Sequence, residues 1–216
     1  MKLAIMIPAF NEAAVLSKTI AEIPKKFDGI EQSFILVIND GSTDETEEVA
    51  LRAGADRVIT HPYNMGLSAA LQSGIKESLN LGADLIVNTD ADNQYKGKCI
   101  NDLIRPCLNN GVDLVVGCRP IRNHPEFSSI KIVLQLFGSW VVRKISGSNV
   151  IDAPSGFRCF SEKFARHLKI YNRYTYTIES IFQASFSGFK IENVPVEINL
   201  ETRPSKLVKN IPNYVF

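Results

Sequence analysis

The sequence predicts an α/β fold with a mostly parallel, Rossmann-like central sheet that helices cover on both faces. Four short apolar or β-branched runs, at 3–7, 34–38, 57–60 and 84–88, alternate with helical patterns at short and regular spacing. Such alternation is typical of right-handed βαβ units and a parallel sheet. Hydrophobic residues make up 45% of the 216 residues, which is enough for a substantial core.

Local signals set the predicted boundaries in the first half of the chain. Pro8 closes the first strand, and Asn11 is a suitable N-cap for the helix that follows. Ser42 and Glu45 have the spacing of a capping box, which predicts a helix start after the second strand. Glycines at the ends of the later patterns mark helix termini. The predicted helices of this half span 12–23, 42–53 and 67–81.

The second half continues with helices at 98–108, 127–145, 162–168 and 177–187 and strands at 113–116 and 190–198. Pro195 inside the last strand indicates an edge strand or a bulge. The apolar helix at 127–145 has two interpretations. It is either a core helix or a helix on a membrane surface, with Trp140 and the pair Arg143 and Lys144 at the headgroups.

Composition excludes several classes of function. The formal net charge of +1 argues against a nucleic-acid-binding protein, which usually carries a basic excess. The N-terminal apolar run is too short for a signal peptide, and no apolar run reaches the length of a membrane span. The histidines are too far apart in sequence to indicate a zinc site. The cysteines have no Cys-x-x-Cys spacing and indicate reduced, mostly buried thiols; they are Cys99, Cys107, Cys118 and Cys159.

Polar clusters follow three of the predicted strands, at 8–12, 39–44 and 89–94. Ligands of parallel sheets bind beyond the carboxyl ends of the strands, so we expect these clusters along one rim. In an extended backbone Asp90 and Asp92 present their side chains on the same side. Mg²⁺ commonly takes one or two carboxylates together with substrate phosphates, so the pair indicates a metal–diphosphate site. An isolated Asp-x-Asp is more often a solvated turn, and the convergence of three clusters favours the site.

Five motifs resemble those of the family-2 glycosyltransferases, whose nucleotide-sugar-binding fold is called GT-A. They lie at 7–12, 39–44, 66–68, 90–94 and 152–158. Within that family the chain looks most like the dolichol- or polyprenol-phosphate sugar transferases. This narrower likeness rests on Gln94 after the acids, on the Ser-Gly-Phe-Arg segment at 155–158, and on Arg-Pro-Ser-Lys-Leu at 203–207.

The resemblance implies roles for individual residues. The catalytic residues would be Asp90, Asp92 and Asp152. The nucleotide-sugar site would be Pro8, Phe10, Glu12, Asn39, Asp40 and Asp90, and the metal ligands Asp92, Gln94 and Asp90. The acceptor or phosphate site would be Arg119, Lys131, Ser155, Arg203 and Lys206. The family commonly has two adjacent acids where this chain has Asn39 and Asp40, which leaves the nucleotide base open.

Simpler interpretations remain for some of these residues. Asp152 is the best remaining carboxylate for a general base, or it is a turn residue that caps Ser155 or Gly156. Arg158 is expected either in the site or in an ion pair with an acid such as Glu179. For the segment at 66–68 we prefer helix entry with a secondary binding role.

The resemblance implies an inverting glycosyltransferase that depends on Mg²⁺ or Mn²⁺. It would move a hexose from GDP-mannose or a UDP-sugar to a polyprenyl or dolichyl phosphate at the cytoplasmic face of a membrane. One alternative is a saccharide hydroxyl acceptor with Asp152 as base, and another is a non-catalytic nucleotide-sugar-binding domain. We expect residues 1–200 to form the catalytic domain. We expect 201–216 to be a basic tail that leads to a membrane region absent from this chain.

Overall fold

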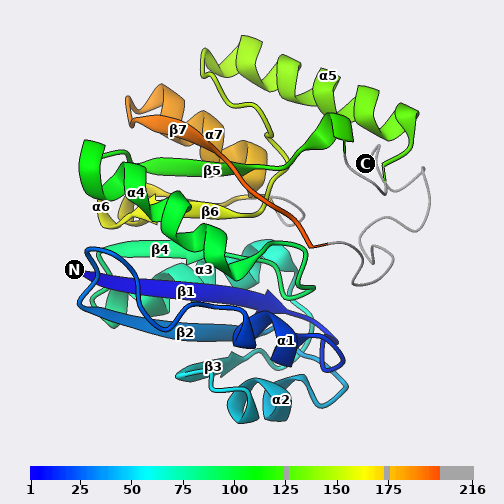
Figure 1. The fold of residues 1–216 in the computed structure, drawn as a ribbon, viewed down its shortest axis with the longest axis vertical. Coiled ribbons are helices and arrows are strands. Elements are labelled where there is room, and N and C mark those ends of the chain that lie inside the picture. The colour runs from blue at the N-terminus through cyan, green and yellow to red at the C-terminus, as the bar shows by residue number, and fades with distance from the viewer. Residues whose placement is uncertain (124–126, 173–175, 200–216) are drawn as a thin grey trace.

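The protein is an α/β sandwich built on a seven-stranded sheet in the order β3-β2-β1-β4-β6-β5-β7 (Figure 1). The computed structural model describes residues 1–123, 127–172 and 176–199. All strand pairs are parallel except those that β6 makes with β4 and β5. The predicted mostly parallel sheet is therefore confirmed. The strands are β1 (Lys2–Ala9), β2 (Gln32–Asn39), β3 (Arg57–Thr60), β4 (Leu85–Asn88), β5 (Leu114–Cys118), β6 (Arg158–Ser161) and β7 (Ile191–Pro195).

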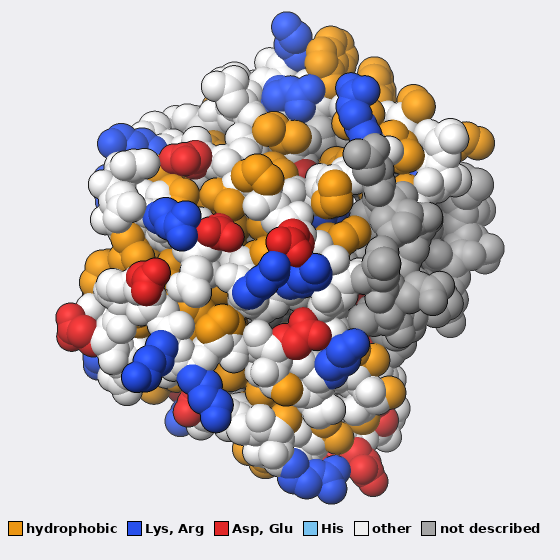
Figure 2. All heavy atoms as spheres, in the orientation of Figure 1, with side chains coloured by type: hydrophobic (Ala, Val, Ile, Leu, Met, Phe, Trp, Pro, Cys, Tyr) orange, Lys and Arg blue, Asp and Glu red, His pale blue; other side chains and the backbone are white. Residues whose placement is uncertain are grey.

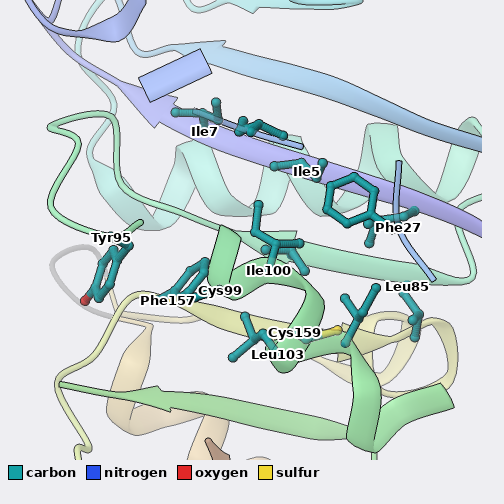
Figure 3. Close-up of a cluster of buried hydrophobic side chains, with 14 of the residues drawn as sticks. Ile5, Ile7, Phe27, Leu85, Tyr95, Cys99, Ile100, Leu103, Phe157 and Cys159 are labelled. Atoms are coloured by element: carbon teal, nitrogen blue, oxygen red, sulfur yellow. The ribbon is translucent and has the colours of Figure 1, made fainter. Parts of the chain in front are cut away.

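Helices cover both faces of the sheet. They are α1 (Leu16–Ala21), α2 (Thr46–Arg52), α3 (Leu67–Asn80), α4 (Ile100–Asn110), α5 (Ser129–Ser146), α6 (Glu162–His167) and α7 (Thr177–Phe186), with short 3₁₀ turns η1 (Gly97–Cys99) and η2 (Ile121–Asn123). Alternate residues of β1 point to opposite sides, as strand geometry requires. Ile5 and Ile7 pack with α1 and α4 in one core cluster (Figure 3), whereas Met6 packs with α3, α6 and α7 in the other.

Two predicted helix starts are wrong. The first helix begins at Leu16, because Asn11 adopts a left-handed backbone with φ of 55° and does not cap it. The second begins at Thr46 without a side-chain cap, so the predicted capping box does not form. Ser42 instead accepts a hydrogen bond from the Asn11 amide, at 2.9 Å. Contacts between the loops after β1 and β2 therefore take the place of the helix caps that the local sequence predicted.

Pro8 does not end the first strand as predicted, because β1 continues through it to Ala9. In a strand, every second residue directs its backbone N–H and C=O groups towards the same neighbouring strand. Met6 accepts a hydrogen bond from the Thr89 amide on the β4 side. Pro8 therefore faces the side of β4 as well, two residues beyond the last pair between β1 and β4. The missing N–H of the proline consequently breaks no pair of the ladder.

Strand β6 is the element that sequence patterns did not predict. It is four residues long and runs antiparallel between β4 and β5. Its first residue, Arg158, is fully buried. The guanidinium donates to the carbonyls of Ala153, Ser155 and Thr177 at 2.6–2.8 Å, so the expected pairing with Glu179 is wrong. The Glu179 carboxylate accepts from the amides of Tyr171 and Asn172 instead.

The remaining expectations concern the cysteines, the edge of the sheet and the C-terminal tail. All four cysteines are buried and free, as predicted, and β7 lies at the sheet edge, as Pro195 indicated. The predicted basic tail at 201–216 lies outside the described residues. No helix in the described part of the chain is long and apolar enough to cross a membrane.

Candidate active site

The loops after β1 and β2 are joined at the carboxyl end of the sheet, where the polar clusters were expected to meet. Asn11 Oδ1 accepts from the Thr43 amide at 2.8 Å, and the Glu12 amide donates to Thr46 Oγ1 at 2.9 Å. Glu12 is 8% exposed, and Phe10, 38% exposed, lies at the surface beside it. The two loops thus form one wall of the rim.

The loop after β4 forms the adjoining wall, and it turns sharply rather than extending. Asp92 Oδ1 accepts from the Gln94 amide at 3.1 Å, which closes a turn around Asn93. Asn93 and Asn11 are the two non-glycine residues with positive φ among the described residues. Asn tolerates this left-handed conformation better than most residues. Ala91 and Asp92 themselves lie in a turn, so the extended geometry predicted for Asp90 and Asp92 is wrong, although the charge of Asp92 still raises the pKa of Asp90.

Asp90 occupies the centre of this wall. Its carboxylate lies against Gly156 in the loop before β6, where a Cβ atom would come within 2.9 Å of Oδ1. Tyr176 completes the contact, since its hydroxyl accepts from Asn88 Nδ2 at 2.8 Å and donates to the Gly156 carbonyl at 3.2 Å. Sequence reasoning assigned no role to Gly156, Tyr176 or Asn88. The glycine inside the motif at 155–158 was the available signal.

The electrostatics of the rim favour a cation. The pKa of Asp90 is raised to about 7, first by burial and then by the charge of Asp92, with a smaller contribution from Glu12 and with Arg119 opposing the shift. Nearby carboxylates that repel one another gain most from a hard divalent ion. Among the described residues, no three His, Cys, Asp or Glu side chains form a closed metal site. The predicted ligands Asp90, Asp92 and Gln94 carry side-chain oxygens, the donor type that Mg²⁺ and Mn²⁺ prefer, and a set of three would leave positions for phosphate oxygens.

The buried pair Asn39 and Asp40 organises the next loop. Asp40 accepts from the amides of Met65 and Gly66 at 2.9 and 2.8 Å and lies 2.7 Å from His61 Nδ1. The other ring nitrogen of His61 lies 2.9 Å from Ser73 Oγ. Asn39 Oδ1 accepts from the Ser42 amide at 3.1 Å. Both side chains hold the loops that border the rim, and Gly66 serves as the helix entry that we preferred.

Arg119 and Asp152 form a two-pronged ion pair beside Asp90. Arg119 follows β5, and its Nε and Nη2 donate to the two Asp152 oxygens at 2.8 and 2.9 Å. Nη2 also donates to Gln135 Oε1 on α5 at 3.3 Å. Asp152 is fully buried, and Arg119 is 10% exposed at its side chain. The backbone carbonyl of Asp152 accepts from the Ser155 amide, so the residue lies in a turn, but its carboxylate bonds Arg119 and does not cap Ser155 or Gly156.

The other residues predicted for acceptor binding lie in different settings. Ser155 is fully buried, and its hydroxyl lies 3.4 Å from that of Tyr95, away from any surface. Tyr95 stacks on Phe157 with ring centroids 4.8 Å apart (Figure 3). Lys131 is exposed on α5 with its Nζ over the Phe127 ring, 3.9 Å from the centroid. Arg203 and Lys206 lie outside the described residues.

A separate surface hollow of 880 Å³ lies along α6 and α7. Its lining includes Arg166, Tyr171 and Phe182 and contains none of the residues that the sequence assigned to the site. The acids of the candidate site therefore lie outside this hollow.

The family model described as Glycosyl transferase family 2 matches residues 4–184. The chain belongs to this family. The site at the carboxyl end of the sheet is accordingly the candidate active site of a glycosyltransferase, as the sequence motifs predicted.

Two relatives of this glycosyltransferase are aligned over most of both chains. A UDP-N-acetylglucosamine–dolichyl-phosphate N-acetylglucosaminyltransferase of Methanococcus voltae is 28% identical, over 89% of this chain and 84% of the relative. An undecaprenyl-phosphate mannosyltransferase of Micrococcus luteus is 26% identical, over 91% and 83%.

Solved structures confirm the GT-A fold of this glycosyltransferase. Glucosyl-3-phosphoglycerate synthase from Mycobacterium tuberculosis, in complex with Mn²⁺, UDP and phosphoglyceric acid, superposes with a TM-score of 0.74. It is 22% identical, and the match covers 94% of this chain and 72% of that one.

The contact between Asp90 and Gly156 gives a direct test of the site. Gly156→Ala places a methyl group against the carboxylate and must displace it, because the added Cβ would lie 2.9 Å from Oδ1. We expect the transfer rate to fall at least about tenfold, since small displacements of reacting groups are costly. The matched control is Gly138→Ala on α5, where a Cβ meets nothing within 4 Å. Equal transfer rates for the two variants would contradict a role of Asp90 in the reaction.

Proposed function

We propose that this glycosyltransferase moves a hexose from a nucleotide-diphosphate sugar, GDP-mannose or a UDP-sugar, to a polyprenyl or dolichyl phosphate. The names of the Methanococcus voltae and Micrococcus luteus relatives support this class of acceptor. The Mn²⁺ and UDP bound to the Mycobacterium tuberculosis enzyme support the class of donor. The observation in this chain that carries the proposal is the unusual polarity of α5.

Helix α5 directs the polar residues Gln135 and Ser139 inward and several large apolar residues outward. Gln135 accepts from Arg119, and Ser139 accepts from the Ala153 amide at 3.2 Å on the inner side. The outer side is exposed by 47–74% and consists of Ile130, Val133, Leu134, Phe137 and Trp140. Hydrophobic side chains accordingly gather over α5 in Figure 2. An exposed apolar patch of this kind marks an interaction site.

The charges on α5 suit a lipid surface. Its three ionisable side chains are all basic, with Lys131 near the start and Arg143 and Lys144 near the end. An apolar helix face flanked by cations binds the interface of anionic membranes. Because Gln135 connects α5 to Arg119, a lipid phosphate held at that surface would lie next to the catalytic rim. We place the enzyme on the cytoplasmic face of the membrane.

Donor binding falls to the loops at the rim. Pro8, Phe10 and Glu12 border the surface where the base and ribose would lie, while Asn39 and Asp40 hold the loops beneath. Asp90 would face the sugar, and Asp92 with Gln94 would hold Mg²⁺ or Mn²⁺, with Asp90 sharing the ion directly or through water. When bound, the ion offsets the charge that develops on the diphosphate leaving group.

An acceptor phosphate removes the need for a general base. A phosphate monoester has a second pKa of about 6, so it is largely dianionic near neutral pH. One of its oxygens attacks the anomeric carbon, the bond from that carbon to the diphosphate oxygen breaks, and the nucleoside diphosphate leaves with inversion. Asp152, with both oxygens bonded to Arg119, is poorly placed to take a proton. This pairing favours a phosphate acceptor over a saccharide hydroxyl.

A screen of donors and acceptors tests the proposal. Purified protein with Mg²⁺ or Mn²⁺ is incubated with each common nucleotide sugar and a polyprenyl phosphate, and the lipid product is measured. We expect transfer from one donor that stops when EDTA is added. Transfer to a saccharide alone would favour the hydroxyl acceptor, and nucleotide binding without any transfer would favour a non-catalytic binding domain.

The role of α5 is tested by removing part of its apolar face. Leu134 is 63% exposed, so Leu134→Gln should leave the fold intact while weakening binding to vesicles that contain anionic lipid. Burial of one leucine contributes about 2 kcal/mol, which corresponds to a loss of at least about tenfold. Leu51→Gln on α2, where Leu51 is 55% exposed, is the matched control. Equal losses in the two variants, measured by vesicle sedimentation, would contradict a specific role of α5.

A further inference from the structure

The loop that carries Asp92 and Gln94 is held between two segments that the sequence motifs do not include. On one side lies α1, whose Thr19 hydroxyl donates to the Ala91 carbonyl at 2.8 Å. On the other side lies the chain just after β7, which Figure 1 shows running back across the sheet towards this loop. Tyr95 and Ile198 form an antiparallel bridge there.

Three side chains close this arrangement around Asn93. Both oxygens of Glu22, at the end of α1, accept hydrogen bonds: Oε1 from Asn93 Nδ2 at 3.1 Å and Oε2 from Asn199 Nδ2 at 2.9 Å. Asn199 Nδ2 also donates to the Asn93 carbonyl at 3.0 Å. The Asn199 amide donates to the Gln94 carbonyl at 2.8 Å. We call Glu22, Asn93 and Asn199 the clamp.

The conformation that the clamp holds is unfavourable by itself. Asn93 is 1% exposed with φ of 58°, and its Oδ1 is buried without a hydrogen-bond partner among the described residues. A left-handed backbone and an unsatisfied buried acceptor each cost free energy. Such a conformation persists only where the surroundings fix it, and such sites are commonly functional. The clamp supplies three hydrogen bonds to this one residue and its neighbour Gln94.

We propose that the clamp positions Asp92 and Gln94 for the metal, with Glu22 and Asn199 as positioning residues outside the recognised motifs. Asn93 lies between the two expected ligands, so its backbone angles set the directions of both side chains. The inference rests on the proposed function, because that assigns the metal to Asp92 and Gln94.

The ion pairs of Glu197 strengthen the same junction from the outside. Its carboxylate accepts from Lys96 Nζ at 2.7 Å and from Lys98 Nζ at 2.8 Å. These groups are partly exposed, so they contribute little by themselves. They join the segment at 196–199 to the chain immediately after the metal loop. The clamp is the buried part of this connection, and the ion pairs are its exposed part.

The test compares Asn199→Ala with Asn193→Ala. Asn193 lies in β7, and its side chain also makes two backbone hydrogen bonds, to Asn149 and Ile151, at 3.0 and 2.9 Å. Two quantities are measured on each variant. One is hydrogen exchange of a peptide covering 92–97 in the metal-free protein, and the other is Mn²⁺ affinity in the presence of UDP or GDP. Thermal melting of each variant checks that it is folded.

We expect Asn199→Ala to speed exchange of the loop peptide and to raise the Mn²⁺ Kd at least about fivefold. Glu22→Gln keeps one acceptor oxygen, so it should change both quantities less, in the same direction. Asn193→Ala should change neither the exchange rate nor the Kd. Wild-type exchange and Kd in both clamp variants would overturn the inference. Wild-type protein that binds no Mn²⁺ would contradict the proposed function, and the exchange measurement would still decide whether the clamp holds the loop.

Discussion

The crowding of negative charge around Asp90 is the constraint on which the rest of the site depends. Burial and the neighbouring Asp92 disfavour its ionised form, and Arg119 opposes them only in part. Folding alone gains nothing from this arrangement, so the surrounding elements must hold it. The sheet brings the loops together, Gly156 leaves room for the carboxylate, and Tyr176 with Asn88 fixes the loop that contains Gly156. The clamp does the same for Asp92 and Gln94.

Strand β6 connects this constraint to the fold. Because β6 runs antiparallel to β4 and β5, it starts at the edge of the sheet where those strands end. The loop before β6, with Asp152 and Gly156, therefore lies beside Asp90. Arg158 fastens that loop to the start of α7 through backbone carbonyls. Arg158 has no carboxylate partner among the described residues, and these bonds stabilise its buried guanidinium, although burial lowers its pKa. Arg158 is thus a structural support of the site.

Sequence patterns predicted what depends on periodicity and topology. The parallel strands, the long helices, the edge position of β7 and the meeting of the three polar clusters all follow from alternation and chain direction. Asn11 and Ser42 were misassigned because their loops bond to each other rather than to their own helices. Strand β6 was missed because its residues, Arg158–Ser161, include no β-branched side chain and form no apolar run. Glu22 and Asn199 were missed because they meet the loop only in three dimensions.

Helix α5 illustrates the same limit. The sequence allowed a core helix or a membrane-surface helix, since apolar spacing does not tell which face is outside. Only the contacts of Gln135 and Ser139 with Arg119 and Ala153 show that the polar side is the inner one. That orientation joins an apolar surface to the catalytic rim, which is what a lipid-linked phosphate acceptor requires.

Titration of the Asp90 carboxyl by carbon-13 NMR, with and without Mg²⁺ and UDP or GDP, tests the central claim most directly. An acid with a raised pKa loses its proton late, so metal-free Asp90 should titrate near pH 7. Addition of Mg²⁺ and the nucleotide should lower that pKa, because the cation favours the ionised form. An Asp90 that titrates near its ordinary value of about 4, and does not respond to Mg²⁺ and nucleotide, would contradict the account.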